Sequence, residues 1–403
     1  MASNSLLTVD MITREAFELF KNSNAFLMNI NRDFDSEFKG GTKIGQSLRI
    51  RLPNDYSVRS GPALQTQGTT EQSTTLTVAT QKGVDLDFTT AERTMSLQDY
   101  SERVLAPAIN NLAGAIAADV MSGTEAICNV AANLDGSGSV ITPTSQTILT
   151  AKAVLADNST PMGMRMLIDS PTTDARVTSA LTGLFNPSQR ISTQYENGMM
   201  KSALGFEWAE DQTVINHTTG SYDGAATVNG AGQSGSTITV SAINGTLKKG
   251  DIITFAGSNA VNRVTKASTG SLRTFAVTAD VASGATSIPI YPALTPPIAG
   301  LAQPYQTVDA SPTNGGAMLL VLPASGVYRK NFAFYKDAVT IAFAELEMPR
   351  GVHEAARVTD DSISMRVLTD YIPTTDQMVT RLDVLYGYKW VRPEWGVIIP
   401  DAI

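Results

Sequence analysis

The chain has 403 residues, of which 42% are hydrophobic and only 17% charged, and its formal net charge at pH 7 is -8. This length exceeds the size at which single hydrophobic cores stop growing, so it predicts two or three domains. The low charged fraction indicates large surfaces that meet neighbouring molecules. A negative chain is poorly suited to holding nucleic acid by charge, because that takes clustered lysine and arginine.

Several protein classes are excluded at this stage. A single cysteine, Cys128, rules out an intramolecular disulfide framework. The first residues show neither the basic nor the apolar region of a signal peptide, and no stretch approaches the 18 or so apolar residues of a membrane helix. We therefore expect a protein that stays in a cytoplasm and has no membrane partner.

The N-terminal residues carry apolar side chains at helical spacing after a possible cap at Thr8, which predicts an amphipathic arm. These side chains are Val9, Ile12, Ala16, Leu19, Phe20, Phe26, Leu27 and Ile30. Apolar and charged residues then alternate over 48–52 and over 84–88, which predicts two strands that face each other. The long polar segment 53–83 between them indicates a protruding two-stranded arm, since compact domains rarely tolerate such a loop without a function.

A long helix is the strongest local prediction. Ser96 and Asp99 resemble a capping box, and apolar residues follow at helical spacing until Gly123. Pro107 lies inside this pattern and should kink the helix. Further on, Ser145 is a possible cap of a helix through Leu155.

An alternating α/β block follows these helices. Residues 164–168 have the composition of a buried strand. Pro171 is placed to open a helix through Leu184, since proline is favoured at the first helical position.

Residues 218–316 interrupt this block with short strand-like pieces rich in Gly, Ser and Thr, and we call them the β-rich insert. Alternation over 247–277 predicts a small barrel or sandwich. The apolar run 319–322 is interpreted as a buried strand of the resumed α/β block, and the proline-rich stretch 289–312 as a return linker.

The core of the insert is basic, because residues 234–290 carry a net charge of +3 while the remainder of the chain carries -11. The basic residues are Lys248, Lys249, Arg263, Lys266 and Arg273, and the acidic ones are Asp251 and Asp280. Such asymmetry predicts a surface that meets an acidic neighbour, and a second copy of the chain is one candidate. Strands are also expected at 332–335, 339–343, 381–388 and 396–399.

The sequence offers little catalytic chemistry. His217 and His353 have no metal-ligand spacing, and Cys128 has no base beside it in sequence. The acidic residues Asp85 and Asp87, like the pair at 360–361, lack the apolar surroundings of an acid/base pair. We therefore expect no enzymatic activity, no catalytic residues, no cofactor and no metal.

The order of these elements resembles the major capsid proteins of tailed bacteriophages, in particular the short-tailed phage coat proteins with an inserted telokin-like domain. Collinear segments carry the resemblance: FNP at 185–187, GF at 205–206, LKKGDIITFAG at 247–257, TFAV at 274–277, NFAFYKDAVTI at 331–341 and LYGYKWVRPEWGVIIP at 385–400. The implied fold is α+β, the tailed-phage capsid (Johnson) fold with an inserted β-barrel. Its parts would be an N-terminal arm (1–38), an extended loop (39–92), a peripheral domain with the spine helix (93–145 and 345–403), an axial domain (146–217 and 317–344) and the insert (218–316).

The resemblance implies a major capsid protein of the virion. Its copies would form the pentamers and hexamers of an icosahedral procapsid around a scaffolding protein in the bacterial cytoplasm, and expand into the mature shell on DNA packaging. Expected partners are other copies, scaffolding protein, portal protein and enclosed double-stranded DNA without sequence-specific binding.

Curvature variation in such a shell needs hinges, and glycine permits them at Gly40, Gly41 and Gly123. The residues we expect at contacts between subunits are Arg49, Arg51, Asp85, Asp87, Lys248, Lys249, Arg263 and Lys266. Two alternatives come from other classes. A β-rich fibre or receptor-binding protein would show repeats, and a hydrolase with a β insertion would need a convergent polar site.

Overall fold

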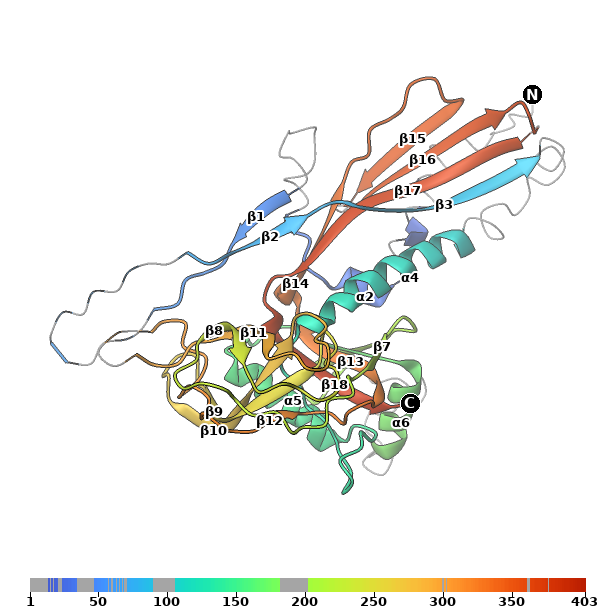
Figure 1. Ribbon diagram of the computed structural model, residues 1–403. Helices are drawn as coiled ribbons and strands as arrows, with labels where there is room; N and C mark the ends of the chain where they lie inside the picture. The colour runs from blue at the N-terminus through green and yellow to red at the C-terminus, as the bar shows by residue number, and fades with distance from the viewer. Residues whose placement is uncertain are drawn as a thin grey trace. The chain divides into compact units, whose positions relative to one another are not determined.

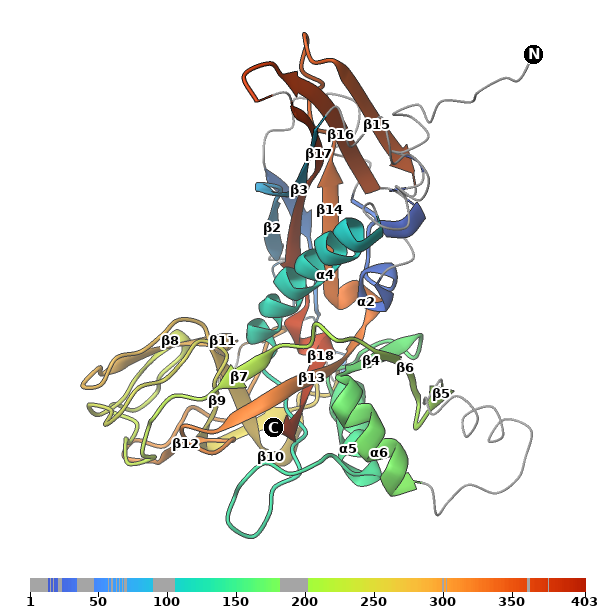
Figure 2. The same ribbon diagram turned by 90° about the vertical axis from the view of Figure 1, so that its right-hand side faces the viewer.

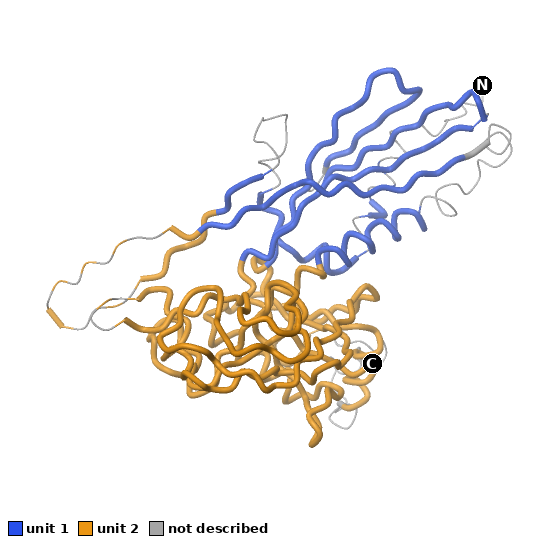
Figure 3. The backbone as a smooth tube through the Cα atoms, viewed as in Figure 1, with its two compact units in different colours: residues 1–50, 73–120, 339–391 blue, residues 51–72, 121–338, 392–403 orange. Residues whose placement is uncertain are grey.

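A computed structural model describes residues 14, 16, 18–20, 24–34, 47–56, 58, 61, 62, 64, 66, 68, 71–89, 106–181, 202–298, 301, 303–360, 363–375 and 377–403. The chain divides into two compact units (Figure 3). Unit 1 comprises residues 1–50, 73–120 and 339–391, and unit 2 comprises residues 51–72, 121–338 and 392–403. Each unit is therefore built from segments that are far apart in sequence.

The main sheet of unit 1 is organised around its longest strand, β17 (Gln377–Trp390), and every pairing in it is antiparallel (Figure 1). One edge of β17 pairs with β3 (Thr80–Thr89). The other edge pairs first with β16 (Ile363–Ile372) and then with β14 (Val339–Ala344), and β15 (Glu354–Asp360) extends the sheet beyond β16. The strand predictions at 339–343 and 381–388 are confirmed.

The helix α4 (Ala106–Ser122) belongs to the same unit up to Val120. Its apolar residues recur every three or four positions and are buried. They are Ile109, Leu112, Ala113, Ile116, Ala117 and Val120. Lys82 on β3 connects the sheet to the helix, because its Nζ lies 2.9 Å from a carboxylate oxygen of Asp119 in α4. The predicted end of the helix at Gly123 is confirmed, while the predicted start at Ser96 lies outside the described residues.

The N-terminal part of unit 1 is helical at residues 14, 16 and 18–20 and again in α2 (Ala25–Met28). Asn24 caps α2 by accepting a hydrogen bond of 3.0 Å from the Leu27 amide. The ring of Phe20 packs edge-on against Phe343 of β14 at a centroid distance of 6.5 Å. Apolar residues of the predicted amphipathic arm are thus buried in this unit.

The predicted partner of the strand at 48–52 is wrong. β1 (Ser47–Arg51) pairs with β2 (Ser73–Thr77), whereas the strand at 84–88 is part of β3 and pairs with β17. The polar segment 53–83, which we interpreted as part of a protruding two-stranded arm, therefore supplies β2, the partner of β1. The burial of Leu76 explains the position of β2, because this side chain is fully buried in a small cluster with Ile50 of β1.

Unit 2 contains a six-stranded sheet in the order β18-β13-β4-β6-β5, with β7 pairing with β13. These strands are β4 (Arg165–Asp169), β5 (Ser202–Ala203), β6 (Phe206–Glu210), β7 (Asn216–Thr218), β13 (Val327–Tyr335) and β18 (Gly396–Ala402). β4 and β6 are parallel, and β13 is antiparallel to β4 and β18. The strands expected at 164–168, 332–335 and 396–399 are confirmed.

Two helices, α5 (Ser145–Asp157) and α6 (Pro171–Leu181), lie beside this sheet in Figure 2 and share its apolar core. Pro171 opens α6 as predicted. The cap of α5 is Thr144 rather than Ser145, because the Thr144 side chain and Thr147 exchange hydrogen bonds in a capping box. The connection after α4 is the 3-10 helix η3 (Gly123–Ala126).

The β-rich insert contributes most of a second sheet of unit 2, with five strands in the order β12-β9-β10-β11-β8. These are β8 (Gly235–Thr239), β9 (Ile252–Val261), β10 (Ser268–Val277), β11 (Ser287–Leu294) and β12 (Met318–Leu320). A core of alternating side chains, including Ile253, Phe255 and Phe275, fills one side of it. The alternation over 247–277 thus corresponds to the paired strands β9 and β10.

Two predictions next to the insert are wrong. The run 319–322 does not resume the α/β block, because β12 pairs with β9 and Leu319 is 48% exposed. The proline-rich stretch begins as β11 rather than as a linker: Pro289 and Pro292 lie in that strand, and Pro289 pairs with Thr237 of β8. A proline in a strand requires only that its missing N–H is not needed in the ladder. Helices and sheets together confirm the predicted α+β class.

Two short 3-10 helices complete the described elements, η5 (Lys336–Ala338) and η6 (Pro393–Trp395). Among the described residues, no helix has both the length and the apolar character needed to cross a membrane.

Candidate assembly contacts

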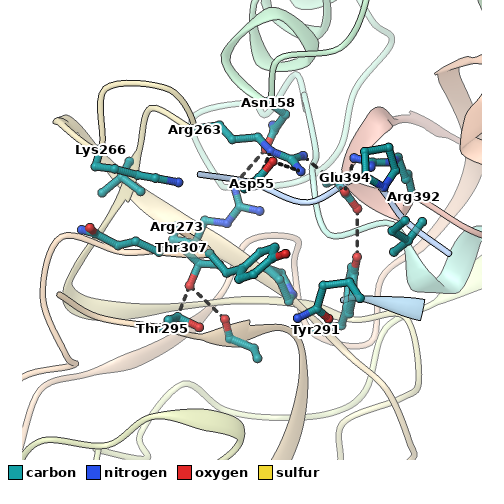
Figure 4. A pocket seen from close by; sticks show the side chains of 18 residues that line it. Asp55, Asn158, Arg263, Lys266, Arg273, Tyr291, Thr295, Thr307, Arg392 and Glu394 are labelled. Atoms are coloured by element: carbon teal, nitrogen blue, oxygen red, sulfur yellow. Dashed lines mark hydrogen bonds and ion pairs between the residues drawn. The ribbon is translucent and has the colours of Figure 1, made fainter. Parts of the chain in front are cut away.

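Arg263 makes the densest set of ionic contacts among the candidate residues. Its guanidinium donates two hydrogen bonds to the Asp55 carboxylate, one of 2.9 Å from Nε and one of 3.2 Å from Nη2. Its Nη1 lies 3.5 Å from Oε1 of Glu394, whose other oxygen accepts a 2.9 Å hydrogen bond from the Tyr291 hydroxyl (Figure 4). The three charged side chains are each about one quarter exposed or less. Arg263 therefore joins three segments of unit 2 that are distant in sequence.

The local sequence explains why Arg263 stands where it does. Asn262 begins the turn between β9 and β10, and its side-chain oxygen accepts the amides of Val264 and Thr265 at 2.9 and 3.1 Å. Lys266 closes the turn in the left-handed region, with φ of +58°. Its ammonium donates to the Pro304 carbonyl oxygen. Burial lowers the pKa of Lys266 below that of a free lysine.

The other basic candidates of the insert are more exposed. Lys248 Nζ lies 3.4 Å from Asp280, with both side chains more than half exposed. Lys249 Nζ lies 2.8 Å from a carboxylate oxygen of Glu125. Exposed pairs of this kind contribute only about 0–1 kcal/mol each.

The candidates of the first ninety residues also have partners within the chain. Asp85 accepts two hydrogen bonds of 2.7 and 2.8 Å from Arg381, which faces it directly across β3 and β17. The hydrogen bond from Arg381 holds the pKa of Asp85 below its usual value. Asp87 accepts a 3.1 Å hydrogen bond from the Gln377 side chain.

Two arginines of β1 complete the set. Arg49 Nε donates to Ser73 Oγ at 2.8 Å, and Arg51 lies 3.9 Å from Glu71 with both side chains more than half exposed. Every candidate residue thus has a partner in its own chain, and their role between subunits stays a prediction.

Of the predicted hinges, Gly40 and Gly41 lie outside the described residues. Gly123 is the first residue of η3, just after the boundary between the two units at 120/121.

His217 and Cys128 occupy buried positions. His217 Nε2 lies 2.9 Å from Oδ1 of the fully buried Asp251, whose other oxygen accepts the amides of Gly220 and Lys248 at 3.0 and 2.8 Å. Burial raises the pKa of the Cys128 thiol, which makes it a poor nucleophile. Within the described ranges, no cluster of three or more His, Cys, Asp or Glu side chains is arranged to hold a metal ion.

Sequence reasoning missed the partners of these candidates: Asp55, Glu125, Arg381 and Glu394. Opposite charges on two strands are a usable signal only when the strand register is known. The contacts of Asp55 and Glu394 have no local signal, since each comes from a segment far from Arg263 in sequence.

A comparison with protein-family models matches residues 1–400 to the model described as "P22 coat protein - gene protein 5". Since this match spans nearly the whole chain, the protein is a coat protein, the major capsid protein of a bacteriophage virion. The chain belongs to the P22 coat protein family. The family resemblance predicted from the sequence is thereby confirmed.

Solved bacteriophage structures are similar to this chain at low identity. A structure of Mycobacterium phage Che8 shares 11% identity at a TM-score of 0.46, covering 93% of this chain and 90% of its own. The capsid of Ralstonia phage GP4 shares 8% identity at a TM-score of 0.46, covering 100% of this chain and 94% of its own. The mature capsid of bacteriophage PhiM1 shares 9% identity at a TM-score of 0.42, covering 89% and 82%. A search of curated proteins finds no significant match.

Proposed function

We propose that copies of this coat protein close an icosahedral procapsid of pentamers and hexamers around a scaffolding protein in the bacterial cytoplasm. The shell then expands when double-stranded DNA enters through a portal, and it has no enzymatic activity of its own. The net charge of -8 supports a shell that encloses DNA without binding it tightly.

The observation that supports assembly is that the segment 53–83, although mostly polar, exposes several large apolar side chains. Tyr56, Val58 and Leu64 are 58, 88 and 84% exposed. Single exposed apolar residues are ordinary on protein surfaces, but three within nine positions of one segment favour a surface that a partner covers. We assign residues 39–92 as an extended loop that lies over a neighbouring subunit in the shell.

The remaining domain assignments follow from the same family. Residues 1–38 serve as the N-terminal arm, 93–145 and 345–403 as the peripheral domain, and 146–217 with 317–344 as the axial domain. Two strands depart from these bounds, because β12 pairs with the insert and β18 pairs with β13 of the axial sheet. The insert 218–316 contacts neighbouring subunits with its basic residues. Gly123, next to the boundary between the two units, serves as a hinge.

The role of the extended loop is tested with Leu64→Glu. The matched control is Thr66→Glu, which places the same charge at another exposed position of the same segment. Purified subunits of each variant are mixed with scaffolding protein and analysed by sedimentation and negative-stain microscopy. We expect shells from the control and folded, unassembled subunits from Leu64→Glu. Equal yields of shells from both variants would remove the loop from the assembly contacts.

A further inference from the structure

A cavity of about 340 Å³ lies within unit 2, beside the Arg263 contacts (Figure 4). The root of the polar segment, the turn after β9, the strands β10 and β11, and the segment after β17 all contribute to its lining. Its size falls within the range of pockets that bind small molecules, about 300–1,000 Å³.

The lining of this cavity is rich in positive charge. Four cationic side chains, Arg263, Lys266, Arg273 and Arg392, face it together with two carboxylates, Asp55 and Glu394. Both carboxylates are engaged by Arg263, at 2.9 and 3.5 Å. The other three cations are left with weaker or neutral partners.

Arg273 is the clearest case among these three. Its Nη1 reaches the amide oxygen of Asn158 at 3.2 Å, and its Nη2 reaches the Cys128 sulfur at 3.7 Å. Both acceptors are neutral, since the amide of Asn158 has no charge and burial raises the pKa of the Cys128 thiol. The Nε of Arg273 is buried and has no hydrogen-bond partner among the residues that the structure describes. A buried guanidinium N–H without an acceptor costs free energy, so the geometry indicates a missing anionic acceptor.

Lys266 and Arg392 have unused donor capacity as well. The Lys266 ammonium has three donors and makes one hydrogen bond, to the Pro304 carbonyl oxygen. Arg392 lies 3.7 Å from Glu394 and stacks over the Trp395 ring at 4.5 Å. Burial lowers the pKa of Lys266 and of Arg392, and a bound anion would oppose that effect.

We propose that this cavity is a binding site for a small oxyanion of the phosphate class, either inorganic phosphate or the phosphate group of a free mononucleotide. The guanidinium fork of Arg273 suits two oxygens of a tetrahedral anion, and Lys266 and Arg392 neutralise its charge. The two carboxylates oppose binding, but the four cationic side chains outnumber them, so the lining keeps a formal charge of +2. A bound phosphate would tie the end of α5, the strand β10 and the C-terminal segment together.

The test uses the full-length subunit and isothermal titration calorimetry, with inorganic phosphate and adenosine monophosphate as separate probes in chloride buffer of constant ionic strength. The variants are Arg273→Gln and Lys266→Gln, so that a folding defect in one does not end the test. The control is Lys248→Gln, an exposed lysine of the insert that does not line the cavity.

We expect saturable binding of one anion per chain by the unmodified subunit and by the control, and affinity about tenfold lower or worse in both cavity variants. The tighter of the two probes identifies the source of the phosphate. Absence of saturable binding by either probe, or equal affinity in all variants, would overturn the proposal. Binding of a DNA oligonucleotide but of neither small probe would overturn it too.

Discussion

Lys330 is a charged residue that the fold buries without a partner. It lies in the middle of β13 and is completely inaccessible to solvent, and its Nζ makes no hydrogen bond to any described part of the chain. Burial lowers its pKa from 10.5 to about 8, and the nearby carboxylates Glu125 and Asp251 oppose the effect only in part. The folded protein is therefore destabilised whenever this lysine is protonated.

The size of this effect follows from the gap between the two pKa values. At 1.36 kcal/mol per pH unit, the gap between 10.5 and about 8 corresponds to about 3 kcal/mol. Between pH 8 and 10.5 the unfolded chain binds a proton that the folded chain does not, so stability rises with pH in this window. Below pH 8 the full penalty is present. We expect Lys330→Met, which keeps the length of the side chain, to stabilise the protein by up to about 3 kcal/mol at pH 7.

Urea denaturation followed by tryptophan fluorescence measures this difference at pH 7 and at pH 10. The matched control is Lys336→Met, an exposed lysine just beyond the same strand. We expect the advantage of Lys330→Met to shrink strongly at pH 10, while the control stays near the unmodified protein at both values. A variant less stable than the unmodified protein at pH 7, or a difference that does not change with pH, would refute the reasoning.

Three further predictions concern packing and charge. Gly387→Ala would place a Cβ 2.0 Å from the carbonyl oxygen of the last residue of β2. We therefore expect the free energy of unfolding, measured by thermal denaturation, to fall by about 3 kcal/mol. The control Gly68→Ala, which has open space around it, should be nearly neutral. Burial and two neighbouring carboxylates raise the pKa of Asp169 to about 8, so the folded chain holds a proton that the unfolded chain releases above pH 4. Stability should therefore fall as the pH rises from 4 to 8, and Asp169→Asn should flatten that slope in melting curves; an unchanged slope would contradict this. For the bidentate pair, a double-mutant cycle of Arg263→Met and Asp55→Asn should give a coupling energy of about 1–2 kcal/mol in urea denaturation, and strictly additive effects would show that the pair is energetically silent.

The sequence predicts well those elements whose signals are local. Pro171 and the apolar periodicity around it determine the start of α6, and the alternation over 247–277 corresponds to β9 and β10. Strand pairing is predicted less well, because it depends on contacts between distant segments. The apolar run 319–322 was assigned to the α/β block, and only the pairing of the overlapping strand β12 with β9 shows that it belongs to the sheet of the insert.

The candidate contacts show the same limit. Arg263 was identifiable from the sequence as one of the five basic residues of the insert. Its partners Asp55 and Glu394, and the unpaired Nε of Arg273, become visible only when the chain is folded. Charge composition thus indicates which side chains need partners, while the fold determines which partners they find.

The most direct test of a shell-forming coat protein is to follow the purified chain by sedimentation and negative-stain microscopy, alone and with its scaffolding protein. We predict closed particles of uniform size, or rings of five and six subunits, once scaffolding protein is added. A chain that remains monomeric under all these conditions and binds a small molecule that it converts to product would contradict the account.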